Sequence, residues 1–96
     1  MNTMNLVDGI MKSKIRIKII LTLYELGELS ISQLAKTIGS NYTLTLKHVR
    51  ALEEMGIVKE VTVGRMRLIK LNKNTPAYEH LKTLVNTLKN LMNIQQ

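Results

Sequence analysis

The residues that decide the fold are two stretches, Gln33–Gly39 (QLAKTIG) and Leu46–Val58 (LKHVRALEEMGIV). In both stretches, apolar residues recur at the three- and four-residue spacing of one helix face, and a glycine follows the last of them. A glycine in that position is a common helix stop. The pattern therefore predicts two consecutive helices, the first short, joined by a tight turn at Gly39-Ser40-Asn41.

A further helix is predicted before this pair, over residues 13–26, with Ser13 as its N-cap and Gly27 as its stop. Its apolar stripe consists of Ile15, Ile19, Ile20, Leu23 and Leu26. Residues 29–31 are expected to be extended, and Ser32 is the predicted N-cap of the second helix. The third helix is predicted over residues 42–55, and its expected core positions are Thr45, Val49, Leu52 and Met55.

After Gly56 the apolar period changes from helical to alternating. Residues 57–63 and 66–72 are rich in Val, Ile and Leu and are separated by Gly64-Arg65, which predicts a β-hairpin. We therefore expect a mainly α fold with one small hairpin (α+β), in which a helix-turn-helix is followed by a β-hairpin wing.

The last predicted helix begins at Thr75-Pro76, since Pro suits the first helical position. Its apolar residues follow a seven-residue repeat, which indicates a short coiled-coil seam. The seam could pair with a second copy, pack on its own domain or bind another protein, and pairing in a homodimer is the prediction. The predicted dimer interface is Leu81, Leu84, Val85, Leu88, Leu91 and Met92.

Three regions are predicted: an N-terminal segment, a DNA-binding domain and a dimerisation helix. Residues 1–12 belong either to the dimer interface or to a frayed terminus. Residues 13–73 form the domain, and residues 74–96 form the C-terminal dimerisation helix. A domain of this size is marginally stable alone, which also favours oligomerisation because the chain of 96 residues has no cysteine for disulfides.

The charge balance favours a polyanionic partner. Fourteen Lys and Arg oppose seven Asp and Glu, which gives a formal net charge of +7. Proteins that bind single strands stack bases on aromatic side chains, and this chain has three Tyr and no Phe or Trp. Double-stranded DNA is therefore the predicted partner.

The two deciding stretches resemble winged-helix transcription regulators of the arsenic-repressor and multiple-antibiotic-resistance-repressor type, and the resemblance extends over residues 14–72. It implies a homodimer whose third helices enter successive major grooves while the wings touch the flanking backbone. Metal-sensing members carry cysteine-rich ligand sets, and this chain has no cysteine, so we expect no metal and no other cofactor. No small-molecule effector is evident either. The Ile- and Lys-rich composition is similar to that of small archaeal regulators.

The predicted DNA contacts lie on the third helix and on the wing. With Val49 and Leu52 facing the core, the opposite side of the helix should face the groove. Tyr42 suits either a base contact or a packed helix start, and His48 is expected to be a half-buried packing residue. Arg65 at the hairpin tip is the predicted phosphate or minor-groove contact. The full set is Asn41, Tyr42, Thr43, Leu46, Lys47, Arg50, Lys59, Arg65 and Arg67.

The acidic residues Glu53 and Glu54 end the third helix and are expected to face away from DNA. Enzymatic activity is not expected, because the chain has one Asp, no Cys and no Gly-rich phosphate loop. With no secretory signal and no membrane span, the protein is expected in the cytoplasm, associated with the nucleoid. The predicted function is sequence-specific regulation of transcription. The alternatives are a non-specific architectural DNA binder and a winged-helix module that binds protein.

Overall fold

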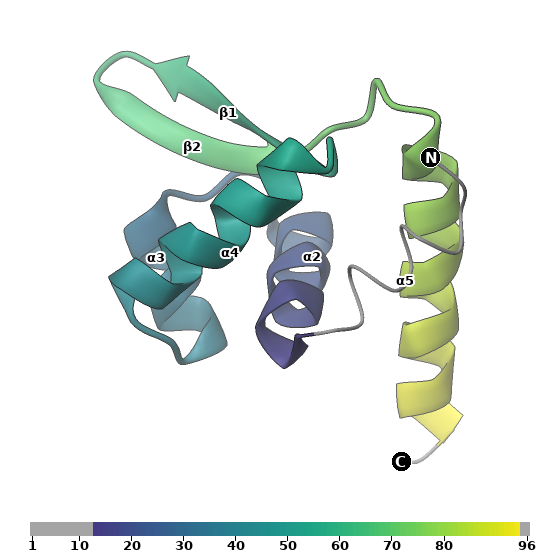
Figure 1. Cartoon of the computed structure of the whole chain (residues 1–96). Helices are drawn as coiled ribbons and strands as arrows, with labels where there is room; N and C mark the ends of the chain where they lie inside the picture. Colours follow the sequence, from purple (N-terminus) through teal and green to yellow (C-terminus); the bar gives the residue numbers. More distant parts are fainter. Residues whose placement is uncertain (1–12, 95–96) are drawn as a thin grey trace.

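The computed structural model describes the backbone of residues 13–94 and the side chains of residues 13–91. Residues 1–12, for which an interface or frayed terminus is predicted, and the side chain of Met92 lie outside the described residues. Within residues 13–94, four helices and a two-stranded antiparallel hairpin form a winged helix-turn-helix fold of the α+β class (Figure 1). The elements are α2 (Lys14–Leu26), α3 (Ile31–Ile38), α4 (Tyr42–Glu54), β1 (Val58–Val63), β2 (Met66–Leu71) and α5 (Ala77–Ile94).

The ends of α2 are where the sequence predicts them. The Ser13 hydroxyl accepts hydrogen bonds from the amides of Ile15 and Arg16, and the Gly27 amide donates to the Leu23 carbonyl. Ile19, Ile20 and Leu23 are buried, as their stripe predicts. Leu26 is 59 % exposed, so the inward position predicted for it is wrong: it is the last residue of the helix, next to the Gly27 C-cap, and does not join the core cluster.

The N-cap of α3 is Ser30, and the prediction of Ser32 is wrong. The Ser30 hydroxyl accepts from the Gln33 amide at 3.2 Å, and the Gln33 side chain accepts from the Ser30 amide at 3.0 Å. This reciprocal capping box satisfies two amides that otherwise have no partner at a helix start. As a result α3 begins two residues earlier, at Ile31, than a helix capped at Ser32 would. Gly39 ends α3 in the left-handed conformation, with φ +73°.

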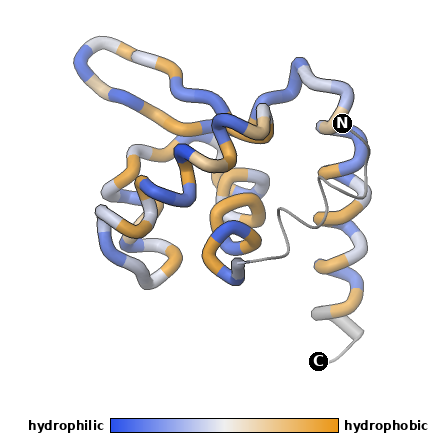
Figure 2. The backbone as a smooth tube through the Cα atoms, viewed as in Figure 1, coloured by the Kyte–Doolittle hydropathy of each residue, from blue (hydrophilic) through white to orange (hydrophobic). Residues whose placement is uncertain are grey.

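The core lies where α2, α3 and α4 meet under the hairpin. Leu34 on α3 and Val49 and Leu52 on α4 are fully buried, as predicted. The neighbouring Thr45 is buried as well, and Met55 packs against the same cluster. In Figure 2 the hydrophobic segments of these helices face one another. The helical periodicity of the sequence thus correctly identified the core positions of the helix-turn-helix.

The hairpin pairs Val58 with Leu71 at its base and Val63 with Met66 at its tip. Gly64, the first loop residue, has φ +63°, the conformation that a two-residue hairpin loop requires at this position. Leu29, in the link between α2 and α3, exchanges two backbone hydrogen bonds with Ile69 on β2. This bridge ties the hairpin base to the helices, so the wing leaves the core in one fixed direction.

Helix α5 begins at Ala77, and the Thr75 hydroxyl accepts from the Ala77 amide at 3.4 Å. Its Leu81 and Val85 are 2 % and 1 % exposed and belong to the same core cluster as residues of α2. An ion pair between Lys89 and Glu25 joins α5 to the end of α2. The tail helix is therefore docked on its own domain.

Candidate nucleic-acid interface

One side of α4 is free of core contacts and carries polar and basic side chains. Thr43, Lys47 and Arg50 are exposed and recur at four- and three-residue spacing, on the side opposite Val49 and Leu52. Tyr42, the first residue of α4, is 54 % exposed, which excludes the alternative that it packs against the domain at the helix start. A helix of this kind, with its N-terminal side chains exposed, suits insertion into a major groove.

Asn41 caps the N-terminus of α4. Its side-chain oxygen accepts from the Leu44 amide at 2.8 Å, and Asn41 is thereby the N-cap of α4. Asn41 is one of the predicted groove contacts, and its residue type also favours this cap, since Asn is among the commonest N-caps. The carbonyl of its side chain is committed to the helix start.

A cleft separates the exposed side of α4 from the wing. It is lined by the start of α3, by α4 and by the inner face of the hairpin, which carries Glu60 and Arg67. The cleft therefore brings together residues from three elements that are far apart in sequence. Its lining residues are Ser30, Ile31, Ser32, Tyr42, Leu46, Arg50, Glu60, Arg67 and Ile69.

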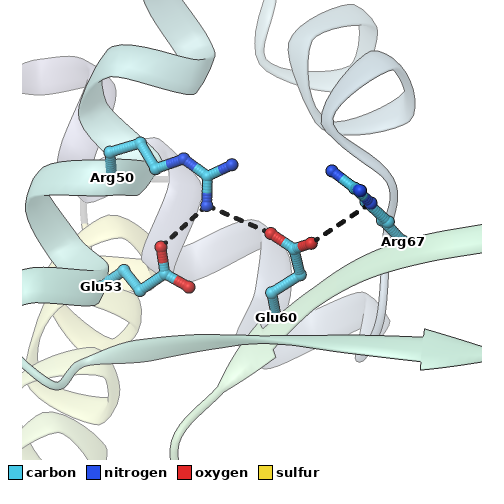
Figure 3. A network of polar contacts seen from close by, with 4 residues as sticks. All are labelled: Arg50, Glu53, Glu60 and Arg67. Atoms are coloured by element: carbon cyan, nitrogen blue, oxygen red, sulfur yellow. Dashed lines mark hydrogen bonds and ion pairs between the residues drawn. The ribbon is translucent and has the colours of Figure 1, made fainter.

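Four charged side chains form a network at this cleft (Figure 3). Arg50 donates to Glu53 at 2.9 Å and to Glu60 on β1 at 3.1 Å, and the Arg67 Nε lies 3.7 Å from the other Glu60 oxygen. These hydrogen bonds raise the pKa of Arg50. Glu53, which is predicted to face away from DNA, pairs with Arg50 along α4, so its carboxylate lies beside one of the predicted DNA contacts.

The wing residues divide between two faces, since alternate residues of a strand point to opposite sides. Arg67 shares the inner face with Glu60, whereas Lys59 lies on the outer face, so these two predicted contacts do not act on one surface. Arg65 is exposed at the tip. Beside it Val63 and Met66 are 56 % and 53 % exposed. The alternating apolar pattern of the strands did not predict this exposure, because the tip of the hairpin projects beyond the helices that would bury one of its faces (Figure 2).

His48 lies on the flank of α4 that faces α2 and is partly buried, as predicted. Its Nδ1 accepts a hydrogen bond from the Arg16 Nε at 3.2 Å. Burial lowers the pKa of His48, and the positive charges of Arg16 and Lys47 lower it further. The contact joins α4 to the start of α2, and no periodic pattern could have shown it, because the two residues are 32 positions apart.

The residues predicted for a dimer interface are not all equally accessible. Leu81 and Val85 are buried within the chain, and Leu84 packs partly against the same core. Leu88 is partly exposed and Leu91 is 51 % exposed. The chain itself accounts for the burial of the first two, which leaves Leu88 and Leu91 as the described residues of the seam that are most available to a second chain.

Within residues 13–94, no group of three or more His, Cys, Asp or Glu is arranged to hold a metal ion. None of the helices in that range combines the length and the hydrophobicity needed for a membrane span.

Solved structures with the same fold cover nearly all of the chain. A predicted DNA-binding transcriptional regulator from E. coli superposes with a TM-score of 0.77 at 22 % identity, covering 92 % of this chain and 86 % of that one. The transcriptional repressor BigR from Xylella fastidiosa gives 0.76 at 25 % identity, covering 97 % and 85 %. HlyU from Vibrio cholerae gives 0.73 at 19 % identity, covering 95 % and 97 %.

No curated protein matches the sequence. The family described as winged helix-turn-helix DNA-binding matches residues 12–59, which include α2, α3, α4 and the start of β1. This is half of the 96 residues, and it contains both of the stretches that decide the fold. The chain belongs to the winged helix-turn-helix DNA-binding family.

Proposed function

We propose that the protein is a transcription regulator that binds specific sites in double-stranded DNA as a homodimer. In this proposal α4 enters the major groove and the wing contacts the flanking backbone. The observation that carries it is the exposed side of α4, which presents Thr43, Lys47 and Arg50, and of these Arg50 also lines the cleft between α4 and the wing. The similar structures titled as a transcriptional regulator and a transcriptional repressor support a regulatory role.

Each predicted contact has a role in this proposal. Tyr42, Thr43 and Lys47 face base edges, and Leu46 meets a thymine methyl group. Asn41 contributes through the amides of the helix start that it caps, because a helix N-terminus favours phosphate. The remaining contacts are to the DNA backbone, by Arg50, Arg65, Arg67 and, from the outer face of the wing, Lys59.

The homodimer supplies the second helix and wing, which bind the second half-site of the DNA. A single wing and helix cover one half-site, and two such units bind adjacent major grooves about 34 Å apart. The described residues that support pairing through α5 are Leu88 and Leu91, which the core of the chain does not cover. Leu81 and Val85 support it indirectly, since they hold α5 in place on the domain.

The test is a binding titration of the purified protein against a library of sites and against random duplex DNA, at two salt concentrations. A preferred, roughly palindromic site that is still bound at the higher salt concentration supports a dimeric regulator. Binding that has no preferred site and is lost with salt would identify an architectural binder. Absence of binding to any duplex would favour a module that binds protein.

The wing is tested by Arg65→Ala, with Lys82→Ala on α5 as a control that removes the same charge elsewhere. Arg65→Ala should weaken binding to all sequences similarly and reduce the salt slope by about one unit, because it removes one phosphate contact. Lys82→Ala should leave the affinity nearly unchanged. A change in the preferred base at any position in the Arg65 variant would contradict the backbone role.

A further inference from the structure

The cleft between α4 and the wing contains an acidic residue at its centre, where a phosphate-binding surface would be expected to be purely basic. The side chain of Glu60 is 23 % exposed, against 49 % for Arg50 and 77 % for Arg67. Its two oxygens face two different arginines, one on α4 and one on β2. Among the described residues, the pair of Arg50 and Glu60 is the only ion pair that links α4 to the wing.

The expected path of the DNA gives this position its importance, and this step rests on the proposed function. A helix in the major groove and a wing that contacts the backbone beyond the edge of that groove lie on either side of one phosphodiester strand. That strand must cross the cleft between α4 and the wing, which Arg50 and Arg67 line. Phosphates would therefore approach the two guanidinium groups that Glu60 already engages.

The charges at the cleft compensate one another before DNA arrives. Arg50 and Arg67 carry two positive charges, and Glu53 and Glu60 carry two negative ones. A phosphate that pairs with either arginine must compete with a carboxylate, and it also comes close to that carboxylate's negative charge. The two arginines attract a passing phosphate less strongly than two unpaired arginines would.

We propose that Glu60 is a specificity-determining residue, which restrains Arg50 and Arg67 so that the cleft accepts the DNA strand only when α4 is seated on its site. On random DNA the phosphates alone must displace the carboxylate, and binding is weak. On a specific site the base contacts of α4 place the strand against the two guanidinium groups, so that its phosphates compete with the carboxylate more effectively. Glu60 thus lowers the affinity for random DNA more than the affinity for the specific site.

The test compares Glu60→Gln with the wild type in the full chain. Glutamine keeps the size and one acceptor oxygen and removes the charge, and a thermal melt checks that the variant folds. The dissociation constants for the selected site and for a random duplex of equal length are measured over a range of salt concentrations. Glu79→Gln is the matched control, since it removes the same charge on α5, where Glu79 pairs with Lys82 away from the cleft.

Glu60→Gln should raise the affinity for random DNA by about tenfold, the order expected for one partly screened charge. The affinity for the specific site should rise less than threefold by this proposal, so the ratio of the two affinities falls. Glu79→Gln should leave that ratio unchanged. In an Arg67→Gln background the effect of Glu60→Gln should shrink, because one of the restrained arginines is then absent.

Three results would overturn the proposal: an unchanged affinity ratio in Glu60→Gln, a ratio that rises instead of falling, or an equal effect of Glu79→Gln. A wild-type protein without any preferred site would instead overturn the proposed function. The two failures are distinguishable, because the first three results concern a protein that still prefers its site.

Discussion

At the scale of single residues, hydrogen bonds to side chains decide where the helices begin. Ser30 and Ser32 are both acceptable caps by residue type, and the difference lies in the residue three positions later. Three positions after Ser30 stands Gln33, whose side-chain oxygen accepts a hydrogen bond from the Ser30 amide. Three positions after Ser32 stands Ala35, whose side chain can accept none. The capping-box pattern was present in the sequence and predicts the correct start once both bonds are considered.

Ser30→Ala should therefore destabilise the protein by about 1 kcal/mol, because the N-cap acceptor for the Gln33 amide is lost. For a domain of this size that corresponds to a fall in Tm of roughly 4–8 °C. Ser32→Ala is the control and should change the stability by less than about 0.5 kcal/mol. Thermal and urea unfolding measure both variants, and equal losses would argue against the capping box.

His48 shows how a residue-scale contact becomes a pH effect. Burial and the charges of Arg16 and Lys47 lower its pKa in the folded protein, so the unfolded chain binds a proton more readily. The unfolded state then binds more protons than the folded state at pH values from about 6.5 downwards. The free energy of unfolding is unaffected by this group at higher pH and falls as the pH decreases through that range.

The contribution of His48 is measured from the urea midpoint at several pH values between about 7.5 and 5, a range that brackets its ordinary pKa. His48→Gln should flatten the decrease seen in the wild type, because glutamine does not titrate. His80→Gln, at an exposed position on α5, should leave the decrease in place. If both variants retained the wild-type slope, other groups would be responsible for it.

At the scale of secondary-structure elements, α5 divides its apolar residues between two environments. Leu81 and Val85 lie one turn apart on the same face and enter the core against α2. Leu88 is seven residues beyond Leu81 and is only partly covered. In Figure 1 the last turns of α5 extend below the other helices, and Leu91 in these turns is 51 % exposed. A regular seven-residue repeat therefore acquires two different roles along one helix.

Leu81→Ala should cost roughly 2–5 kcal/mol, since it removes a buried side chain and leaves a cavity. Leu91→Ala on the same helix should change the free energy of unfolding by less than about 0.5 kcal/mol in the monomer, because that side chain is half exposed. Urea unfolding at low protein concentration checks both. A small effect of Leu81→Ala would mean that α5 is not docked on the core in solution.

At the scale of the whole molecule, size and charge set the conditions for function. A domain this small has little stability to spare. The net charge of +7 attracts polyanions but disfavours the close approach of two copies. Pairing through the uncovered end of α5 would place an apolar contact between chains that otherwise repel one another. The affinity for DNA and the oligomeric state should therefore depend on each other.

Leu88→Asp should shift the protein to a monomer and weaken binding to a two-half-site duplex, because it places a charge in the proposed contact. Asn86→Asp adds the same charge at an exposed position of α5 and is the control. Sedimentation or light scattering measures the molecular mass over a range of protein concentrations. A dimer that persists in Leu88→Asp would place the interface elsewhere on the molecule.

The sequence by itself determined the elements and their inward faces. Glycines at positions 27, 39, 56 and 64 end helices or form the hairpin loop, and the apolar period distinguishes helix from strand. Such signals act between residues a few positions apart, so they do not depend on how the rest of the chain packs. For the same reason the exposed side of α4 was predictable once its buried side was known.

Only the tertiary structure decided which distant side chains meet. Glu60 contacts Arg50 across ten positions, Arg16 contacts His48 across 32, and Leu26, at the end of α2, stays outside the core cluster. These outcomes depend on the angle at which the wing leaves the core and on where α5 docks. No local pattern encodes those placements, because the packing of the whole core determines them.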